Sequence, residues 1–163
     1  MTSDPPEKPP RPGEVRAEMP PATDAGLRFI GRLETPWKTR ADCPKNLGQA
    51  RERGGAATLH LAPPYRAALA GLAVGDAVLI LTWMDGADRD LVVQAPRHRT
   101  EPAGTFALRS PARPNPIGLG TVRITALDAA AGRVGLDASD CLDGTPVIDL
   151  KPWIGRVDIP PGA

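Results

Sequence analysis

A proline-rich segment from Gly104 to Gly118, GTFALRSPARPNPIG, carries groups suited to binding an anion. Its three internal prolines hold the backbone extended and remove hydrogen bonds that a sheet would need. Arg109 and Arg113 project from this stiff frame. Because proline lowers the entropy lost on binding, their guanidinium groups are predicted to be pre-organised for a carboxylate or a phosphate. Asn115, between two prolines, offers an amide oxygen as an acceptor; its other interpretation is a turn residue.

A second segment, from Asp140 to Trp153 (DCLDGTPVIDLKPW), brings carboxylates to a turn. Asp143 is followed by Gly144, and this pair is a strong turn signal. Ionised carboxylates accept hydrogen bonds from hydroxyl and ammonium groups, so Asp140 and Asp143 are candidate binding residues. The alternative is structural: the two segments would be a hairpin loop and a turn whose arginines and aspartates balance each other's charge.

Several familiar sites are excluded by what the chain lacks. It has no Walker A loop, and the glycine pair at 118 and 120 lacks the third glycine of a dinucleotide-binding fingerprint. His60 and His98 are the only histidines and there is no Cys-x-x-Cys motif, so no metal site is expected. Cys43 and Cys141 are interpreted as free thiols.

The charges are segregated along a chain that is almost neutral overall. Twenty Lys and Arg against nineteen Asp and Glu leave a formal charge of +1, so composition gives no argument for nucleic-acid binding. Residues 28–53 carry seven basic against three acidic side chains, and residues 97–123 carry five against one. Residues 124–149 carry five aspartates and one arginine. This segregation is compatible with two interpretations: a local basic surface that binds a partner, or charge balance within the folded chain.

Short apolar runs bounded by Gly, Pro and Asp predict the elements that must position these residues. Twenty prolines and seventeen glycines argue against a helical bundle. We predict a mostly β fold, a small closed or partly open β-barrel with one or two short helices. One helix is expected from Tyr65 to Leu69, after Pro64. The strand candidates are 27–33, 58–61, 76–84, 91–93, 105–108, 122–126, 134–136 and 147–150.

The first 25 residues form a separate segment. Seven of the twenty prolines fall in its first 24 positions, with few large apolar side chains. Such a segment cannot bury enough apolar area to offset its ordering entropy, which predicts a disordered tail at 1–25 and one domain at 26–163. No apolar run is long enough to cross a bilayer and no secretory signal is visible, so a cytoplasmic protein is expected.

Four stretches together resemble a known family. They are Ile30 to Pro36 (IGRLETP), Pro44 to Asn46 (PKN), the segment from Gly104 to Gly118 and the segment from Asp140 to Trp153. They are similar to the motifs IG.I.SP, PRQ, G.FA.RSP.RPNPIG and D..DGTPV.DIKPY of the TrmO, or TsaA-like, proteins. That family comprises S-adenosylmethionine-dependent tRNA methyltransferases. The resemblance implies a compact β-barrel, a homodimer, and methylation of N6 on N6-threonylcarbamoyladenosine at position 37 of tRNA.

The resemblance also implies site residues. The positions that match cofactor-binding residues are Pro44, Lys45, Asn46, Asp85, Arg109, Leu119, Asp140 and Asp143. Three of them depart from the family pattern. Lys45 keeps the charge of an arginine but loses its bidentate fork, Asn46 keeps an amide on a shorter stem, and Asp85 stands where the family has a histidine.

The implied chemistry is an in-line displacement on an already activated methyl donor, so positioning dominates. The adenine N6 needs hydrogen-bond acceptors, and Asn115 and Asp85 are the catalytic candidates. Arg97, Arg99 and Arg113 are predicted to hold the tRNA anticodon stem-loop through its phosphates. Two alternatives stay open: the same fold and cofactor with another RNA or a small-molecule acceptor, or a non-catalytic dimer that binds the cofactor or RNA.

Overall fold

The computed structural model describes residues 9–21 and 24–162, which fall into two compact units. The barrel unit comprises residues 26–84 and the described residues from 117 onward. The hairpin unit comprises residues 85–116 together with the described residues up to 25. Because the hairpin unit is inserted between two neighbouring barrel strands, its chain leaves and re-enters the barrel at neighbouring points.

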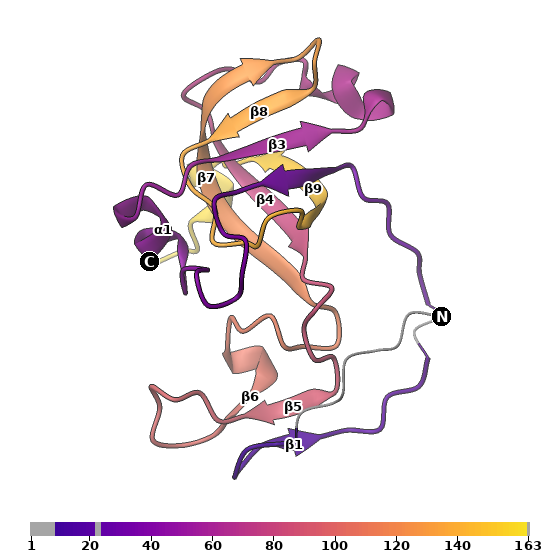
Figure 1. The fold of residues 1–163 in the computed structure, drawn as a ribbon, viewed down its shortest axis with the longest axis vertical. Helices are drawn as coiled ribbons and strands as arrows, with labels where there is room; N and C mark the ends of the chain where they lie inside the picture. Colours follow the sequence, from indigo (N-terminus) through magenta and orange to yellow (C-terminus); the bar gives the residue numbers. More distant parts are fainter. Residues whose placement is uncertain (1–8, 22–23, 163) are drawn as a thin grey trace. The chain divides into compact units, whose positions relative to one another are not determined.

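The barrel unit is a closed antiparallel β-barrel, which confirms the predicted fold class (Figure 1). Its strand order is β2-β3-β8-β7-β4-β9. The strands are β2 (Gly31–Glu34), β3 (Ala57–Leu61), β4 (Ala77–Trp83), β7 (Ile117–Asp128), β8 (Arg133–Leu136) and β9 (Pro146–Pro152). Closure leaves no unpaired sheet edge in the barrel.

The barrel core is built from the apolar residues that alternate along these strands. Leu59, Val78, Val134 and Val147 are fully buried, as the period of two in a strand requires. In β4 every second residue is buried and the residues between are half-buried, although the sequence of the strand is almost continuously apolar. The buried residues therefore give the barrel one contiguous interior.

Three short helices accompany the barrel: α1 (Leu47–Glu52), η1 (Pro63–Leu69) and α2 (Gly155–Asp158). The predicted helix near Pro64 exists, but η1 is a 3-10 helix that begins at a proline pair. Pro63 and Pro64 fit its first turn because they need no intrahelical N–H partner.

The hairpin unit contains a small sheet in the order β1-β5-β6, with strands β1 (Val15–Arg16), β5 (Leu91–Gln94) and β6 (Ala103–Gly104). The strand predicted at 105–108 is wrong, because η2 (Thr105–Ala107) is a 3-10 turn. The Thr105 hydroxyl donates to the Leu91 carbonyl oxygen at 2.6 Å, and the Leu108 N–H donates to the Thr105 carbonyl oxygen at 3.1 Å. These bonds turn the chain away from the sheet.

The predicted N-terminal tail lies partly outside the described residues, which exclude 1–8 and 22–23. Residues 15 and 16 form β1 and pair with β5, so this part of the segment is held by backbone hydrogen bonds. The domain boundary at residue 25 stays a prediction.

Candidate functional site

Two loops of the barrel unit are joined through Asp143. The Thr35 N–H donates to Asp143 Oδ1 at 2.9 Å, and the Asp143 N–H donates to the Trp37 carbonyl oxygen at 2.8 Å. Lys38 Nζ lies 2.9 Å from Asp143 Oδ2. The hydrogen bond from Lys38, followed by that from Thr35, lowers the pKa of the Asp143 carboxyl group. Asp143 thus stays ionised and fixes the loop that leads to Pro44.

Trp37 anchors the same loop from its other side. Its ring is buried, and its Nε1–H donates to the Ser139 carbonyl oxygen at 2.5 Å. The Arg53 guanidinium lies 4.5 Å from the ring centroid, a cation–π contact. Ala50 and Ala138 pack against the ring as a small second core. The loop between Thr35 and Asn46 is therefore braced at a buried aromatic side chain.

The close approach of Trp37 to the backbone at Gly55 predicts a sensitive position. A Cβ added at Gly55 would overlap the Trp37 ring and lie 2.9 Å from the Ala50 carbonyl oxygen. We expect Gly55→Ala to lower the free energy of unfolding by about 1–3 kcal/mol, the cost typical of overpacking. The matched control is Gly104→Ala, because nothing lies within 4 Å of its added Cβ. Urea denaturation of both variants checks this, and equal stabilities would contradict it.

The predicted cofactor residues Pro44, Lys45 and Asn46 lie at the start of α1. Pro44 is buried, and Asn46 is the N-cap, its Oδ1 accepting the Gln49 N–H at 2.9 Å. Gln49 reciprocates, because its Oε1 accepts the Lys45 N–H at 3.0 Å. This mutual capping uses the Asn46 side-chain oxygen but not its amide N–H groups, and both Lys45 and Asn46 are exposed.

Helix α1 is fixed on the barrel by Arg51. Its Nε lies 2.7 Å from Asp137 Oδ2, and its Nη2 donates to the Thr121 carbonyl oxygen at 3.0 Å. A Cβ at Gly120 of β7 would lie 3.2 Å from Leu47 Cδ1, so the absence of a side chain there lets α1 approach the strand. The Pro44–Asn46 segment is thereby held against one end of the barrel.

Asp140 and the two cysteines meet at this same end. The Cys43 thiol donates to the Asp140 carbonyl oxygen at 3.0 Å, and Cys141 Sγ lies 3.8 Å from the Thr82 hydroxyl. Burial and the nearby Asp140 charge raise the pKa of Cys141 to about 11, and the same two causes raise the pKa of Cys43. Both thiols are free and stay protonated at neutral pH.

The raised pKa of Cys141 predicts a loss of stability at alkaline pH. The unfolded thiol ionises near 9 and the folded one near 11, so above pH 9 the unfolded state binds fewer protons than the folded state. We expect the free energy of unfolding to fall by roughly 2–3 kcal/mol between these values. Cys141→Ala should lack this component. Urea denaturation from pH 8 to 11 measures both slopes, and parallel slopes would contradict the assignment.

Of the remaining predicted residues, Leu119 is the one that lies in the barrel unit. It lies on the outer face of β7, opposite Leu81 of β4, and is 53% exposed. Its neighbour Gly118 faces the other way, and a Cβ there would overlap the Thr82 hydroxyl. The glycine of the RPNPIG motif is thus required by packing between β4 and β7.

Asp85 and Asn115 belong to the hairpin unit, where its chain leaves and re-enters the barrel. Trp83 pairs with Ile117 in the last register position of β4 and β7, so Asp85 and Asn115 each lie two residues beyond this pair. Both are exposed, and Arg89 Nε donates to the carbonyl oxygen of Pro114, next to Asn115, at 2.8 Å. Both catalytic candidates therefore lie close along the chain to the same end of the β4–β7 strand pair.

The arginines of the hairpin unit differ in their environments. Arg113 is half-buried, and its Nη1 donates to the carbonyl oxygens of Leu108 and Ser110, both at 3.1 Å. Arg113 therefore braces its own loop. The sequence predicted that it binds tRNA and did not indicate this structural role. Arg97, Arg99 and Arg109 are exposed.

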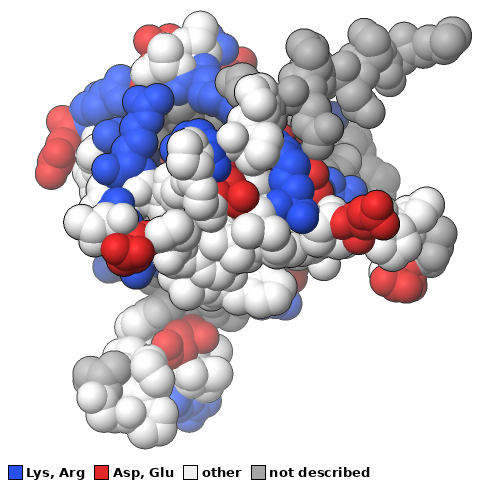
Figure 2. Space-filling view, turned by 90° about the horizontal axis from the view of Figure 1, so that it is seen from below, with Lys and Arg blue, Asp and Glu red and all other residues white. Residues whose placement is uncertain are grey.

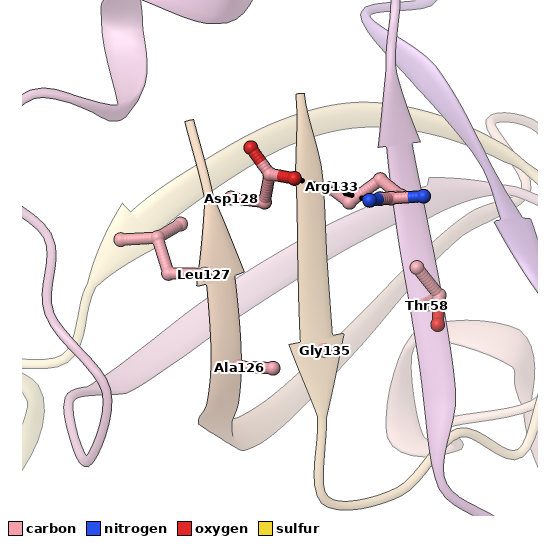
Figure 3. A pocket seen from close by; sticks show the side chains of 6 residues that line it. All are labelled: Thr58, Ala126, Leu127, Asp128, Arg133 and Gly135. Atoms are coloured by element: carbon pink, nitrogen blue, oxygen red, sulfur yellow. Dashed lines mark hydrogen bonds and ion pairs between the residues drawn. The ribbon is translucent and has the colours of Figure 1, made fainter. Parts of the chain in front are cut away.

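The surface adds two observations. Lys and Arg gather in groups on the face seen in Figure 2, with Asp and Glu between them. A hollow in the barrel wall is lined by Thr58, Ala126, Leu127, Asp128, Arg133 and Gly135 (Figure 3). The ion pair between Asp128 and Arg133 lies at this hollow, and none of the predicted site residues does. Within residues 9–21 and 24–162, no helix is long and apolar enough to span a membrane.

The residues that hold the loops were not predicted from the sequence. Trp37, Lys38 and Arg51 position the predicted residues without belonging to their motifs, and Thr35 does so from within the Ile30–Pro36 motif. A signal existed for α1, because Asn46 followed by Gln49 is the spacing of a capping box. No local signal marks Trp37, since the Ser139 carbonyl oxygen that accepts its ring N–H lies 102 residues away in the chain.

Comparison with known proteins identifies the class of this barrel. Residues 32–159 match the family model of the tRNA-methyltransferase O N-terminal domain. This match covers most of the chain, and the chain belongs to this family.

Individual relatives agree with this assignment. The "Probable S-adenosyl-L-methionine-binding protein VirR" of Rhizobium radiobacter is 39% identical over 142 residues, which are 87% of this chain and 78% of VirR. The tRNA (adenine(37)-N6)-methyltransferase of Eikenella corrodens is 44% identical over 61 residues, which are 37% of this chain and 35% of that protein. The crystal structure of TrmO from Pseudomonas aeruginosa superposes with a TM-score of 0.66 at 32% identity. That match covers 85% of this chain, but the chain spans only 60% of the TrmO chain.

Proposed function

We propose that this chain is an S-adenosylmethionine-dependent methyltransferase that modifies N6 of the adenosine at tRNA position 37. Family membership and the names of the relatives support the cofactor and the reaction class. The structural observation that carries the proposal joins the Asp140–Asp143 segment to the loop that leads into the Pro44–Asn46 segment. Cys43, next to Pro44, donates to the Asp140 carbonyl oxygen, and the Thr35 N–H donates to Asp143. The Pro44–Asn46 and Asp140–Asp143 segments carry two of the motifs that define the resemblance, and they are distant in sequence.

The donor set at this end suits S-adenosylmethionine, which presents an amine, a carboxylate, ribose hydroxyls and an adenine. The half-buried Asp140 would accept from the amine or the hydroxyls, and Asp143 has its carboxylate oriented by Thr35 and Lys38. Lys45 and the Asn46 amide N–H groups would donate to the carboxylate. Leu119 and Arg109 complete the proposed binding set. When bound, the sulfonium supplies an activated methyl group.

The chain's own residues have to position the acceptor and remove its proton. N6 of the threonylcarbamoyl derivative carries a single hydrogen. We assign Asp85 to accept a hydrogen bond from this N6–H group, which directs the nitrogen lone pair toward the donor, and to take its proton as the new N–C bond forms. Asn115 is the alternative acceptor of the same hydrogen bond. Arg97, Arg99 and Arg113 would hold the anticodon stem-loop, with Arg113 acting through the loop that it braces.

Three finer features belong to the same proposal. The acceptor is N6-threonylcarbamoyladenosine rather than unmodified adenosine, the protein acts as a homodimer, and it works in the cytoplasm, where tRNA is available. Sedimentation at micromolar concentration tests the dimer. Transfer to native tRNA, compared with an unmodified transcript of the same tRNA, tests the acceptor: native tRNA alone should be methylated.

Digestion of the tRNA to nucleosides after incubation with labelled methyl donor tests the function as a whole. Label in an N6-methylated adenosine derivative is the expected result. Label in another nucleoside or in a small molecule would favour the same fold with a different acceptor. Calorimetric binding of S-adenosylmethionine without transfer to any RNA would favour a cofactor-sensing protein.

A further inference from the structure

The hairpin unit presents one aromatic side chain to solvent. Phe106 is 84% exposed, the highest exposed fraction among the large apolar side chains of residues 9–21 and 24–162. An exposed phenyl ring lacks the hydrophobic stabilisation that its burial would provide. A ring so placed is a candidate contact for a ligand or partner.

The turn that carries Phe106 is held by buried polar groups. Gln94 Nε2 donates to the Thr105 hydroxyl at 2.9 Å and to the Ala112 carbonyl oxygen at 2.6 Å. Thr105 donates in turn to the Leu91 carbonyl oxygen, and both side chains are buried. The ring is therefore displayed from a fixed backbone, which lowers the entropy lost when it binds.

Cationic side chains accompany this ring in the same unit. Arg97 and Arg99 lie in the connection between β5 and β6, and η2 follows β6 directly. Both arginines are exposed, and in the described part of the chain their guanidinium groups make no hydrogen bond or ion pair. The exposed apolar side chains Val15 and Met19 lie with β1, at the other edge of the sheet from β6.

Arg97 and Arg99 follow one end of the β5–β6 pair and Phe106 follows its other end. An exposed aromatic ring with unpaired arginines in the same unit fits single-stranded RNA better than a protein surface. The centres of protein interfaces are depleted in charge and gather several apolar side chains. Binding sites for unpaired bases combine an aromatic platform with cations that track the phosphates. We propose that Phe106 stacks on an unpaired base of the tRNA anticodon loop, while Arg97 and Arg99 contact phosphates elsewhere in the same stem-loop. This inference rests on the proposed function and deepens it.

The test is tRNA binding by wild type, Phe106→Ala and Phe106→Trp at several salt concentrations. We expect Phe106→Ala to weaken binding by about 5- to 150-fold, the range for loss of one stacked base, and Phe106→Trp to retain it. The slope of log Kd against log salt should stay unchanged in Phe106→Ala, because no charge is lost. Arg97→Gln with Arg99→Gln should lower that slope by about 0.7 per phosphate contact.

The matched control is Phe29→Ala, which removes a 42% exposed phenylalanine from the barrel unit and should bind tRNA like wild type. Unchanged tRNA binding in Phe106→Ala overturns the inference while wild-type methylation leaves the proposed function standing. The inference is also overturned if Phe106→Ala loses cofactor affinity or self-association but keeps its affinity for RNA. A wild-type protein that neither binds nor methylates tRNA overturns both.

Discussion

Asp85→Asn should lower the rate of methyl transfer by about 100- to 10,000-fold, the contribution typical of a positioned general base. The amide keeps the size and the acceptor oxygen of the side chain but cannot take the proton released from N6. Single-turnover transfer from labelled S-adenosylmethionine to tRNA measures this rate. Because Asp85 also matches a cofactor-binding position of the family, the cofactor Kd of the variant shows whether it serves both roles.

Asp88→Asn is the matched control for this prediction. Asp88 lies three residues further in the same loop and forms an ion pair with Arg16 at 3.7 Å. Its loss should change the transfer rate less than threefold. A rate in Asp85→Asn within threefold of wild type would remove Asp85 from the catalytic group and leave Asn115 as the remaining acceptor.

Trp37→Ala should lower the free energy of unfolding by about 3–5 kcal/mol, as expected for a buried aromatic ring reduced to a methyl group. The substitution leaves a cavity between Ala50 and Ala138, removes the cation–π contact with Arg53, and deprives the Ser139 carbonyl oxygen of its donor. Trp37→Phe keeps most of the bulk and should lose only about 1–2 kcal/mol. Urea denaturation measures the series.

The same variants separate packing from a role in the site. Trp153 is 38% exposed, so Trp153→Ala should cost less than about 1 kcal/mol. Because Trp37 and Asp143 brace one loop, Trp37→Ala should also weaken binding of S-adenosylmethionine in the folded fraction. If Trp37→Ala and Trp153→Ala had equal stability, the loop would not depend on its aromatic anchor.

The barrel was predictable because its strands alternate. Leu59 and Leu61 of β3 are buried with the period of two that the residue pattern indicates, whereas the apolar run of β4 predicts a strand but not which of its faces is buried. The turn at Thr105 was not predictable, because apolar residues there resemble a short strand. Its conformation depends on the Thr105 hydroxyl, which donates a hydrogen bond to the carbonyl oxygen of Leu91 in β5.

The site was predictable as a set of motifs but less so as a set of roles. Asn46 is predicted to contact the cofactor, and its side-chain oxygen also caps the N-terminus of α1, which was not predicted. Arg113 was expected to contact tRNA, and it is bonded to the backbone of its own loop. Such roles depend on which groups become neighbours on folding, and residue types alone do not determine that.

Methyl transfer to a single tRNA, and to a variant of it with guanosine in place of adenosine at position 37, tests the central claim most directly. Both RNAs carry the same phosphates and fold, so electrostatic binding is equal and only the acceptor base differs. The account predicts that label from S-adenosylmethionine enters the native tRNA and not the guanosine variant. Equal labelling of the two RNAs, or labelling of neither by protein that binds both, would contradict it.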